Sequence, residues 1–387
     1  MGIFRRGVIS GARVMLLAVV VTGCAEIRLD RMFAVSGDDW TMLGGSVGRL
    51  NKSAAHLQVP LKKMWNYDPG AGVSAQLLVR DSVLLVSTLK GEVHAVNVLD
   101  GKKLGVLSLG APVAGTPVLV GGTIIVPLSR ENESLIAVNL QSGERLWTRD
   151  AGPVESAPLV LDSRVYVTTL NGAALCFNDS DGAELWSFRT RPGKDRRAIR
   201  SSPATDGSAL FFGCDDGFVY AVDLRTGALR WKRDAGGSVF ASPLVADSMV
   251  IVGTLRGELL ALRTDSGTVR WRFDTGAKIY NASAADGARV FVGTSDGSCM
   301  ALDAATGSRL WTFRASNGIG CTPLVLDSLV LVGSLDKTLS VLNRTDGREV
   351  WQWKAEGRIR VTPAVWHEQV FLFSDDRALT AFRMGGD

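Results

Sequence analysis

The sequence predicts an all-β chain folded as an eight-bladed β-propeller, in which each blade is a four-stranded antiparallel sheet and an N-terminal strand closes the ring. Three observations lead to this prediction. A unit of about 40 residues repeats along the chain, each unit holds four short strand-like segments, and each end of the chain holds only part of a unit.

The repeat is clearest at residues 217–231, where an alternating strand leads through the turn Asp-Leu-Arg-Thr-Gly into a second strand that carries Trp231. One degenerate copy has Gly105 in the tryptophan slot, and successive slots lie 39 to 45 residues apart. Because one residue type recurs in nearly every unit, we interpret it as structural, docking blade on blade. The tryptophans in these slots are Trp65, Trp147, Trp186, Trp231, Trp271, Trp311 and Trp351.

One full period shows the four expected strands, which are 239–245, 249–253, 258–262 and the segment around Trp271. After the last tryptophan the chain supplies three more strands and ends, while residues 61–68 form a fourth strand with no unit before it. Joining the two ends completes an eighth blade and removes both open sheet edges. We therefore expect a single propeller domain over residues 39–387.

The N-terminus reads as a targeting segment. Three arginines precede the apolar run 14–21, which is too short to span a bilayer permanently and predicts a signal peptide over residues 1–23. Val-Thr-Gly-Cys24 resembles a bacterial lipobox, which implies lipidation of Cys24 and a tether over residues 24–38. Ala25, in place of aspartate, implies the outer membrane and a chain that faces the periplasm. The alternative is a plain signal peptide with an incidental cysteine.

Charge and cysteine content exclude several classes of protein. Without the three leader arginines the chain has 40 basic and 39 acidic residues, so we expect no nucleic-acid binding. None of the remaining cysteines stands in a Cys-x-x-Cys or Cys-Cys arrangement, and we expect them to be small buried apolar residues, with disulfide pairing left open. These cysteines are Cys176, Cys214, Cys299 and Cys321.

The motif Ala-x-Asp-x-x-Thr-Gly-x-x-x-Trp at 221–231 and 301–311 resembles the tryptophan-docking motif of the PQQ-type quinoprotein propellers, and the resemblance covers residues 40–387. Within that superfamily, an eight-bladed lipoprotein of this size is similar to the BamB family, which binds the β-barrel insertase BamA and helps to fold outer-membrane proteins. The resemblance implies a non-catalytic envelope scaffold, monomeric within a complex, with an envelope protein such as BamA as its partner.

The resemblance also raises an enzymatic alternative. Quinoprotein dehydrogenases have an adjacent-cysteine disulfide over the quinone and Glu, Asn and Asp ligands for calcium; this chain is shorter and has no such cysteine pair. Asp223 and Asp303 recur at one blade position, as turn-forming residues do, and no Ser-His-Asp or metal-spaced set stands out. We expect no catalysis, metal or cofactor. A reduced quinoprotein dehydrogenase or a PQQ-binding protein, with PQQ and calcium, is the alternative.

Function should lie where the repeats differ. Each predicted inner strand has Val or Ile at one position and a variable residue at the next. Neighbouring strand positions face opposite ways, so the variable residues should line one mouth of the central channel. Arginine and aromatic residues are favoured at binding hot spots, although a solvated funnel without a ligand is the alternative. The candidate partner-binding residues at this mouth are Glu155, Arg200, Phe240, Tyr280 and Arg360.

The 45-residue period contains an enlarged loop at 189–200, with six basic residues and one acidic residue. Such a loop can steer the chain towards an acidic partner, and we select Arg196 and Arg197 as candidate contacts. In BamB-like proteins the corresponding loop is leucine-rich and takes part in binding the insertase, so the arginine-rich loop leaves that contact open. The alternatives are a solvated loop and an envelope-glycan binder.

Overall fold

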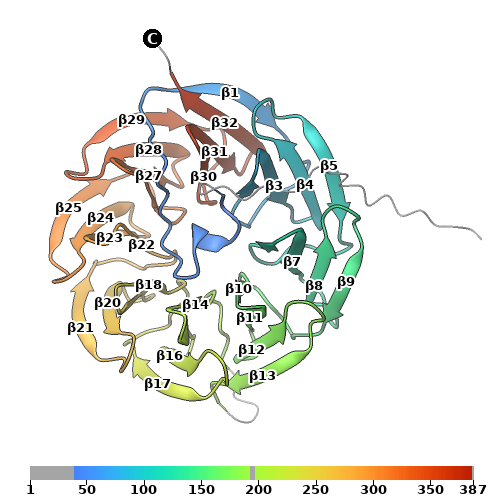
Figure 1. The fold of residues 1–387 in the computed structure, drawn as a ribbon. Coiled ribbons are helices and arrows are strands. Elements are labelled where there is room, and N and C mark those ends of the chain that lie inside the picture. The colour runs from blue at the N-terminus through green and yellow to red at the C-terminus, as the bar shows by residue number, and fades with distance from the viewer. Residues whose placement is uncertain (1–38, 192–196, 386–387) are drawn as a thin grey trace, which may run out of the picture.

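The computed structural model describes residues 39–191 and 197–385. Over this part of the chain it is a closed ring of eight four-stranded antiparallel sheets around a central channel, as Figure 1 shows. The predicted eight-bladed, all-β fold is therefore confirmed. The described helical structure is one short 3-10 turn, η1 (Leu43–Gly45), and no described helix has the length and apolar character needed to cross a membrane.

Each blade runs from an inner strand at the channel to an outer strand at the rim of the disc. Blade 1 consists of β2 (Leu78–Arg80), β3 (Val83–Ser87), β4 (Glu92–Asn97) and β5 (Lys103–Ser108), and blade 2 of β6 (Val118–Val120), β7 (Thr123–Pro127), β8 (Leu135–Asn139) and β9 (Arg145–Arg149). Blade 3 consists of β10 (Leu159–Leu161), β11 (Arg164–Thr168), β12 (Ala173–Asn178) and β13 (Glu184–Arg189), and blade 4 of β14 (Ala204–Thr205), β15 (Ala209–Gly213), β16 (Phe218–Asp223) and β17 (Leu229–Asp234). Blade 5 consists of β18 (Leu244–Ala246), β19 (Met249–Gly253), β20 (Glu258–Arg263) and β21 (Val269–Asp274), and blade 6 of β22 (Ala284–Ala285), β23 (Arg289–Gly293), β24 (Ser298–Asp303) and β25 (Arg309–Arg314). Blade 7 consists of β26 (Leu324–Val325), β27 (Leu329–Gly333), β28 (Thr338–Asn343) and β29 (Glu349–Lys354), and blade 8 of β30 (Ala364–Trp366), β31 (Gln369–Ser374), β32 (Ala378–Met384) and β1 (Leu61–Tyr67).

Burial changes across each blade in the way that its sequence pattern predicts. The second strand, such as β19, is buried along its whole length because neighbouring blades cover both of its faces. The outer strand, such as β17, buries its tryptophan between exposed or half-exposed polar residues. The inner strands are shorter than expected, at two or three residues, because the blades converge at the channel.

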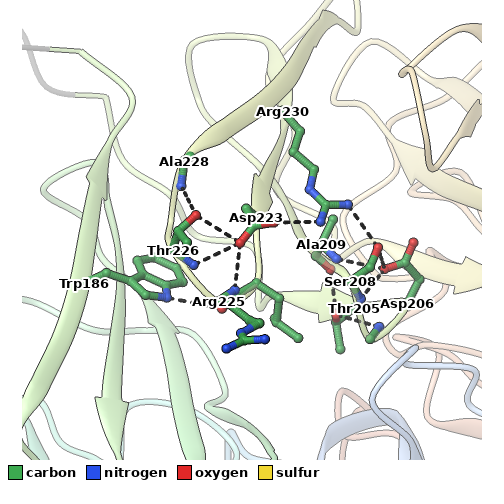
Figure 2. Close-up of polar contacts among 12 residues, drawn as sticks. Trp186, Thr205, Asp206, Ser208, Ala209, Asp223, Arg225, Thr226, Ala228 and Arg230 are labelled. Carbon is green, nitrogen blue, oxygen red and sulfur yellow. Dashed lines mark hydrogen bonds and ion pairs between the residues drawn. The ribbon is translucent and has the colours of Figure 1, made fainter.

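The turn between the third and fourth strands is built around one aspartate. Asp223 Oδ1 accepts hydrogen bonds from the main-chain N–H groups of Arg225 and Thr226 at 3.0 and 2.9 Å, and Arg230 Nη2 donates to its other oxygen at 2.7 Å (Figure 2). The same contacts to the main chain recur at Asp303. Both aspartates therefore form turns, as their recurrence at one blade position suggested.

Six of the seven predicted docking tryptophans dock on the next blade's turn. Trp351 instead packs its ring against Phe382 of β32, at 6.2 Å between ring centres, because blade 8 has no turn between β32 and β1. Trp186 Nε1 donates to the carbonyl of Leu224 at 3.2 Å, and its ring covers Gly227, whose φ is +72° (Figure 2). A tryptophan buries about 150–250 Å², so each contact contributes several kcal/mol at most, at ~25 cal/mol/Å². The other tryptophans that donate to the next turn in this way are Trp65, Trp147, Trp231, Trp271 and Trp311.

The ring closes through the N-terminal strand. β1 pairs with β32 along its whole length, so the first strand of the chain completes the last blade. Trp65 in β1 then docks on Gly101 of blade 1 and donates to the carbonyl of Val98 at 3.0 Å. The predicted closure is confirmed.

The sequence did not reveal where the segment before β1 lies. Residues 39–57 cross one mouth of the channel, where Figure 1 shows the blue chain inside the ring. The inner strands have an unpaired edge towards the channel, and this segment supplies their missing hydrogen-bond partners. Its carbonyl groups accept hydrogen bonds from the main-chain N–H groups of the inner strands at 2.8–3.1 Å. The pairs, donor first, are Leu119 and Thr41, Thr205 and Val47, Val245 and Gly48, Ala285 and Leu50, and Val325 and Asn51.

Arg49 fastens this channel plug (residues 39–57). Its side chain is fully buried, and it donates to the carbonyls of Pro203 at 3.0 Å, Leu43 at 2.7 Å, Ala157 at 3.3 Å and Pro158 at 3.1 Å. Burial lowers the pKa of the guanidinium from its usual value to about 9. The plug is thus held by a cation that bonds main-chain carbonyls of two blades.

Candidate functional site

The variable inner-strand residues lie at the channel mouth opposite the plug. The plug bonds residues such as Val245 in β18, whereas the variable residue of that blade, Phe240, lies five positions earlier. At ~3.3 Å per residue in an extended chain, Phe240 lies roughly 15 Å from Val245, towards the other mouth of the channel. The preceding Val or Ile is buried in all eight blades, and every variable residue is exposed or half-exposed. We call Glu155, Arg200, Phe240, Tyr280 and Arg360 the channel rim.

Three of the rim residues, from three successive blades, form one cluster. Arg200 Nη1 donates to Glu155 Oε2 at 2.8 Å, its Nε donates to Asp215 Oδ2 at 3.3 Å, and its guanidinium lies 5.4 Å from the centre of the Phe240 ring. Burial raises the pKa of Asp215 above its usual value, and Arg200 opposes that shift. Arg200 is therefore held between two carboxylates and an aromatic face. Asp215 was not among the predicted rim residues.

The other two rim residues lie apart from this cluster. Tyr280, in blade 6, is 49% exposed. Arg360, in blade 8, pairs with Asp375 Oδ2 at 3.0 Å, and Arg358 contacts the same oxygen at 3.2 Å. The rim arginines are thus paired with carboxylates of their own chain, and Tyr280 contributes an exposed aromatic side chain to the rim.

The described ends of the enlarged loop, residues 189–191 and 197–200, adjoin the rim cluster. Arg196 lies outside the described residues, as does Cys24, and Arg197 is exposed. The loop is joined to blade 4, since the Arg197 carbonyl accepts from Cys214 Sγ at 3.8 Å and Arg191 Nε lies 3.9 Å from Asp216 Oδ2. Asp216 is buried and accepts a hydrogen bond from Tyr220 at 2.7 Å. Burial and this carboxylate together raise the pKa of Tyr220 well above its usual range.

Two grooves flank the rim cluster on the same face. One, of about 550 Å³, lies between blades 2 and 3 and ends at Glu155; the other, of about 520 Å³, lies between blades 4 and 5 and begins at Asp215. Because the Arg200 cluster joins Glu155 to Asp215, the grooves and the cluster form one continuous surface. Loops of several blades form these grooves, so no single motif in the sequence could predict them.

The described residues include no group of three or more His, Cys, Asp or Glu residues that could hold a metal ion. The four described cysteines are buried free thiols in four different blades, and burial raises the pKa of each to about 12. These thiols are inert packing groups.

Comparison with known sequences identifies the family. The family model described as outer membrane protein assembly factor BamB matches residues 62–155, 90–239, 215–325 and 314–385. The BamB of Xanthomonas campestris is 33% identical over 186 residues, which are 45% of this chain and 44% of the relative. The BamB of Yersinia pestis is 33% identical over 139 residues, 35% of this chain and 33% of the relative. These alignments span less than half of either relative.

Solved structures share the fold. BamB from Moraxella catarrhalis superposes with a TM-score of 0.71 at 18% identity, covering 84% of this chain and all of that chain. Quinohemoprotein alcohol dehydrogenase from Comamonas testosteroni superposes with a TM-score of 0.77 at 14% identity, covering 90% of this chain and 81% of that chain. At these identities the likeness shows the propeller alone, whereas the family match runs through the whole ring. The chain belongs to the BamB family of outer membrane protein assembly factors.

Proposed function

We propose that this protein is a non-catalytic scaffold that assists the assembly of outer-membrane β-barrel proteins. The observation that carries the proposal is the BamB family match, which extends from residue 62 to residue 385 and so includes all eight blades. The protein acts by presenting a surface, and no bond is made or broken on it.

The proposed anchor is a lipid on Cys24, which holds the chain at the outer membrane facing the periplasm. The described chain begins at Asp39, whose carboxylate accepts from the main-chain N–H of Asp81 in blade 1 at 3.1 Å, at the plugged end of the channel. The residues from Cys24 to Asp39 can span at most about 50 Å when fully extended. Asp39, where the described chain begins, is thus on the plugged face, and the channel rim is on the opposite face.

The proposed partner surface is the channel rim with its two grooves and the enlarged loop. Tyr280 offers an exposed aromatic side chain, and the Arg200 cluster offers a rigid, preorganised patch. Arg196 and Arg197 add positive charge that steers an acidic partner towards this face. The proposed partner is the β-barrel insertase BamA.

Affinity purification of the lipidated protein from solubilised envelopes tests the proposal. BamA should co-purify with the wild-type protein, and the double substitution Arg196→Glu/Arg197→Glu should reduce its recovery at least several-fold. Arg225→Glu/Arg348→Glu is the matched control, because both residues are exposed on turns of the plugged face. Wild-type protein that recovers no barrel protein, or equal losses in the two double variants, would overturn the proposed partner surface.

A further inference from the structure

Two junctions between blades have no docked tryptophan. The junction of blades 7 and 8 has no receiving turn, because β32 and β1 are not consecutive in the chain, whereas the junction of blades 1 and 2 has the turn and lacks the indole. Gly105 in β5 pairs with Ala95, as Trp231 pairs with Ala221 in blade 4, so glycine occupies the position of a docking tryptophan. The turn of blade 2 that would receive the indole is nevertheless retained. Gly143 has a φ of +71°, within the 65° to 73° of the glycines beneath the six docked tryptophans.

The receiving turn keeps the chemistry of its equivalents. In each docked pair the indole N–H donates to the carbonyl three residues before the glycine, as Trp147 does to Asp179 at 2.8 Å beside Gly182. The equivalent carbonyl belongs to Leu140. Gly143 is half-exposed, whereas five of the six glycines under a tryptophan are buried. None of the tryptophans of the described chain docks on this turn.

The strand beside the slot is also unusually apolar. After Lys103, β5 continues as Leu-Gly-Val-Leu-Ser, and it is the one outer strand with a single charged residue. Leu104 and Leu99 are 39% and 59% exposed beside it. Outer edges of sheets are normally protected by charged side chains, so this edge lacks the protection that the other seven outer strands have. Leu104 is no more exposed than the leucines at the same position in other outer strands, so the low charge of β5 is what distinguishes this edge.

We propose that the junction of blades 1 and 2 is a docking site for an aromatic side chain, tryptophan above all, presented by another protein. The bound indole would lie on Gly143, donate its N–H to the Leu140 carbonyl and bury the apolar edge of β5. The occupant is inferred from the chain itself, which fills six equivalent slots with this side chain. The site is remote from the channel rim and stands independently of the proposed function.

A titration with N-acetyl-L-tryptophanamide, followed by amide NMR shifts of the folded wild-type protein, tests the proposal. Saturable shifts at Gly143 and Leu140 are expected, and N-acetyl-L-leucinamide should give much weaker ones. Gly105→Trp should fill the slot, raise Tm by a few degrees and abolish the shifts. Leu104→Trp, which adds an indole at the neighbouring position facing the other way, should leave them unchanged.

The proposal is overturned if the probe produces no saturable shift at Gly143, or if the shifts persist in folded Gly105→Trp. Should that variant fail to fold, Gly105→Val blocks the same space with a good strand former and must likewise abolish the shifts. A Gly143 shift that depends on protein concentration without any probe would assign the slot to a second copy of the chain, and would also overturn the proposal.

Discussion

At the scale of single residues, glycine in the turns matters for two separate reasons. A glycine such as Gly227 adopts a positive φ that other residues avoid, and it also leaves room for the indole of the preceding blade. Gly207 shares only the first property, because its φ is +89° and nothing lies within 4 Å of an added Cβ. Comparing the two separates the cost of the conformation from the cost of the contact.

Gly227→Ala should therefore destabilise the protein more than Gly207→Ala does. Strain at a positive φ costs about 1–3 kcal/mol in both variants. The added methyl group of Gly227→Ala also lies 2.6 Å from Trp186 and must displace it. Denaturant unfolding followed by tryptophan fluorescence measures both free energies of unfolding. Equal losses would show that the docked indole does not constrain this turn.

His94 makes the seam between blades 8 and 1 sensitive to acid. Its Nδ1 lies 2.6 Å from the Tyr67 hydroxyl of β1, and its Nε2 lies 3.2 Å from Glu92 Oε2. Burial lowers the pKa of His94 below its usual 6.5, with Lys103 and Lys90 acting in the same direction and Glu92 opposing them. The unfolded chain therefore binds a proton at a higher pH than the folded chain does.

The free energy of unfolding should consequently decrease as the pH falls below about 6.5, the unfolded pKa of histidine. His94→Gln keeps a polar side chain and removes the titration, so the unfolding free energy of this variant should vary less between pH 7.5 and pH 5. The difference from wild type should be ~1 kcal/mol for each unit by which folding lowers the pKa of His94. Thermal unfolding across this range provides the measurement. Parallel pH profiles for the two proteins would exclude His94 as the titrating group.

At the scale of elements, the channel plug and the closing strand share one task. The inner strands leave hydrogen-bonding groups unpaired towards the channel, and residues 39–57 pair them before the chain continues into β1. Arg49 joins the plug to blades 3 and 4 through three carbonyls. The N-terminal segment thus stabilises the ring at its centre as well as at its seam.

Arg49→Met should release the plug, because it leaves buried carbonyls without donors. The expected loss is about 2–4 kcal/mol of unfolding free energy, together with faster proteolytic cleavage within residues 39–57. Arg225→Met, an exposed arginine on the same face, should change neither quantity. A variant that loses stability with no faster cleavage of the plug would show that Arg49 does not fasten this segment.

At the scale of the whole molecule, the repeat made most of the fold predictable. The tryptophan slots determined the number of blades and showed that the first strand must close the last blade, because a periodic pattern depends on local sequence. The alternation of Val or Ile with a variable residue also placed the rim on the exposed side of the inner strands. The position of the plug could not be predicted, because residues 39–57 contain no repeat. They are held by the unpaired edges of inner strands that lie far away in the sequence.

The sequence predicted where the rim residues lie but not that the rim arginines form ion pairs. Arg200 and Arg360 read as exposed cations, whereas the fold pairs them with Asp215 and Asp375. Those carboxylates come from the loops between second and third strands, and only the closed ring brings them to the rim. Similarly, the grooves on either side of the cluster exist only where loops of neighbouring blades meet.

Site-specific photo-crosslinking in intact envelopes tests the central claim most directly. A photoreactive phenylalanine analogue at Tyr280 or Phe240 should crosslink to BamA, whereas the same analogue at Asp247 or Asp327, on turns of the plugged face, should not. Crosslinks to BamA from the plugged face alone, or none to BamA from either face of a correctly localised protein, would contradict a scaffold that acts through its channel rim.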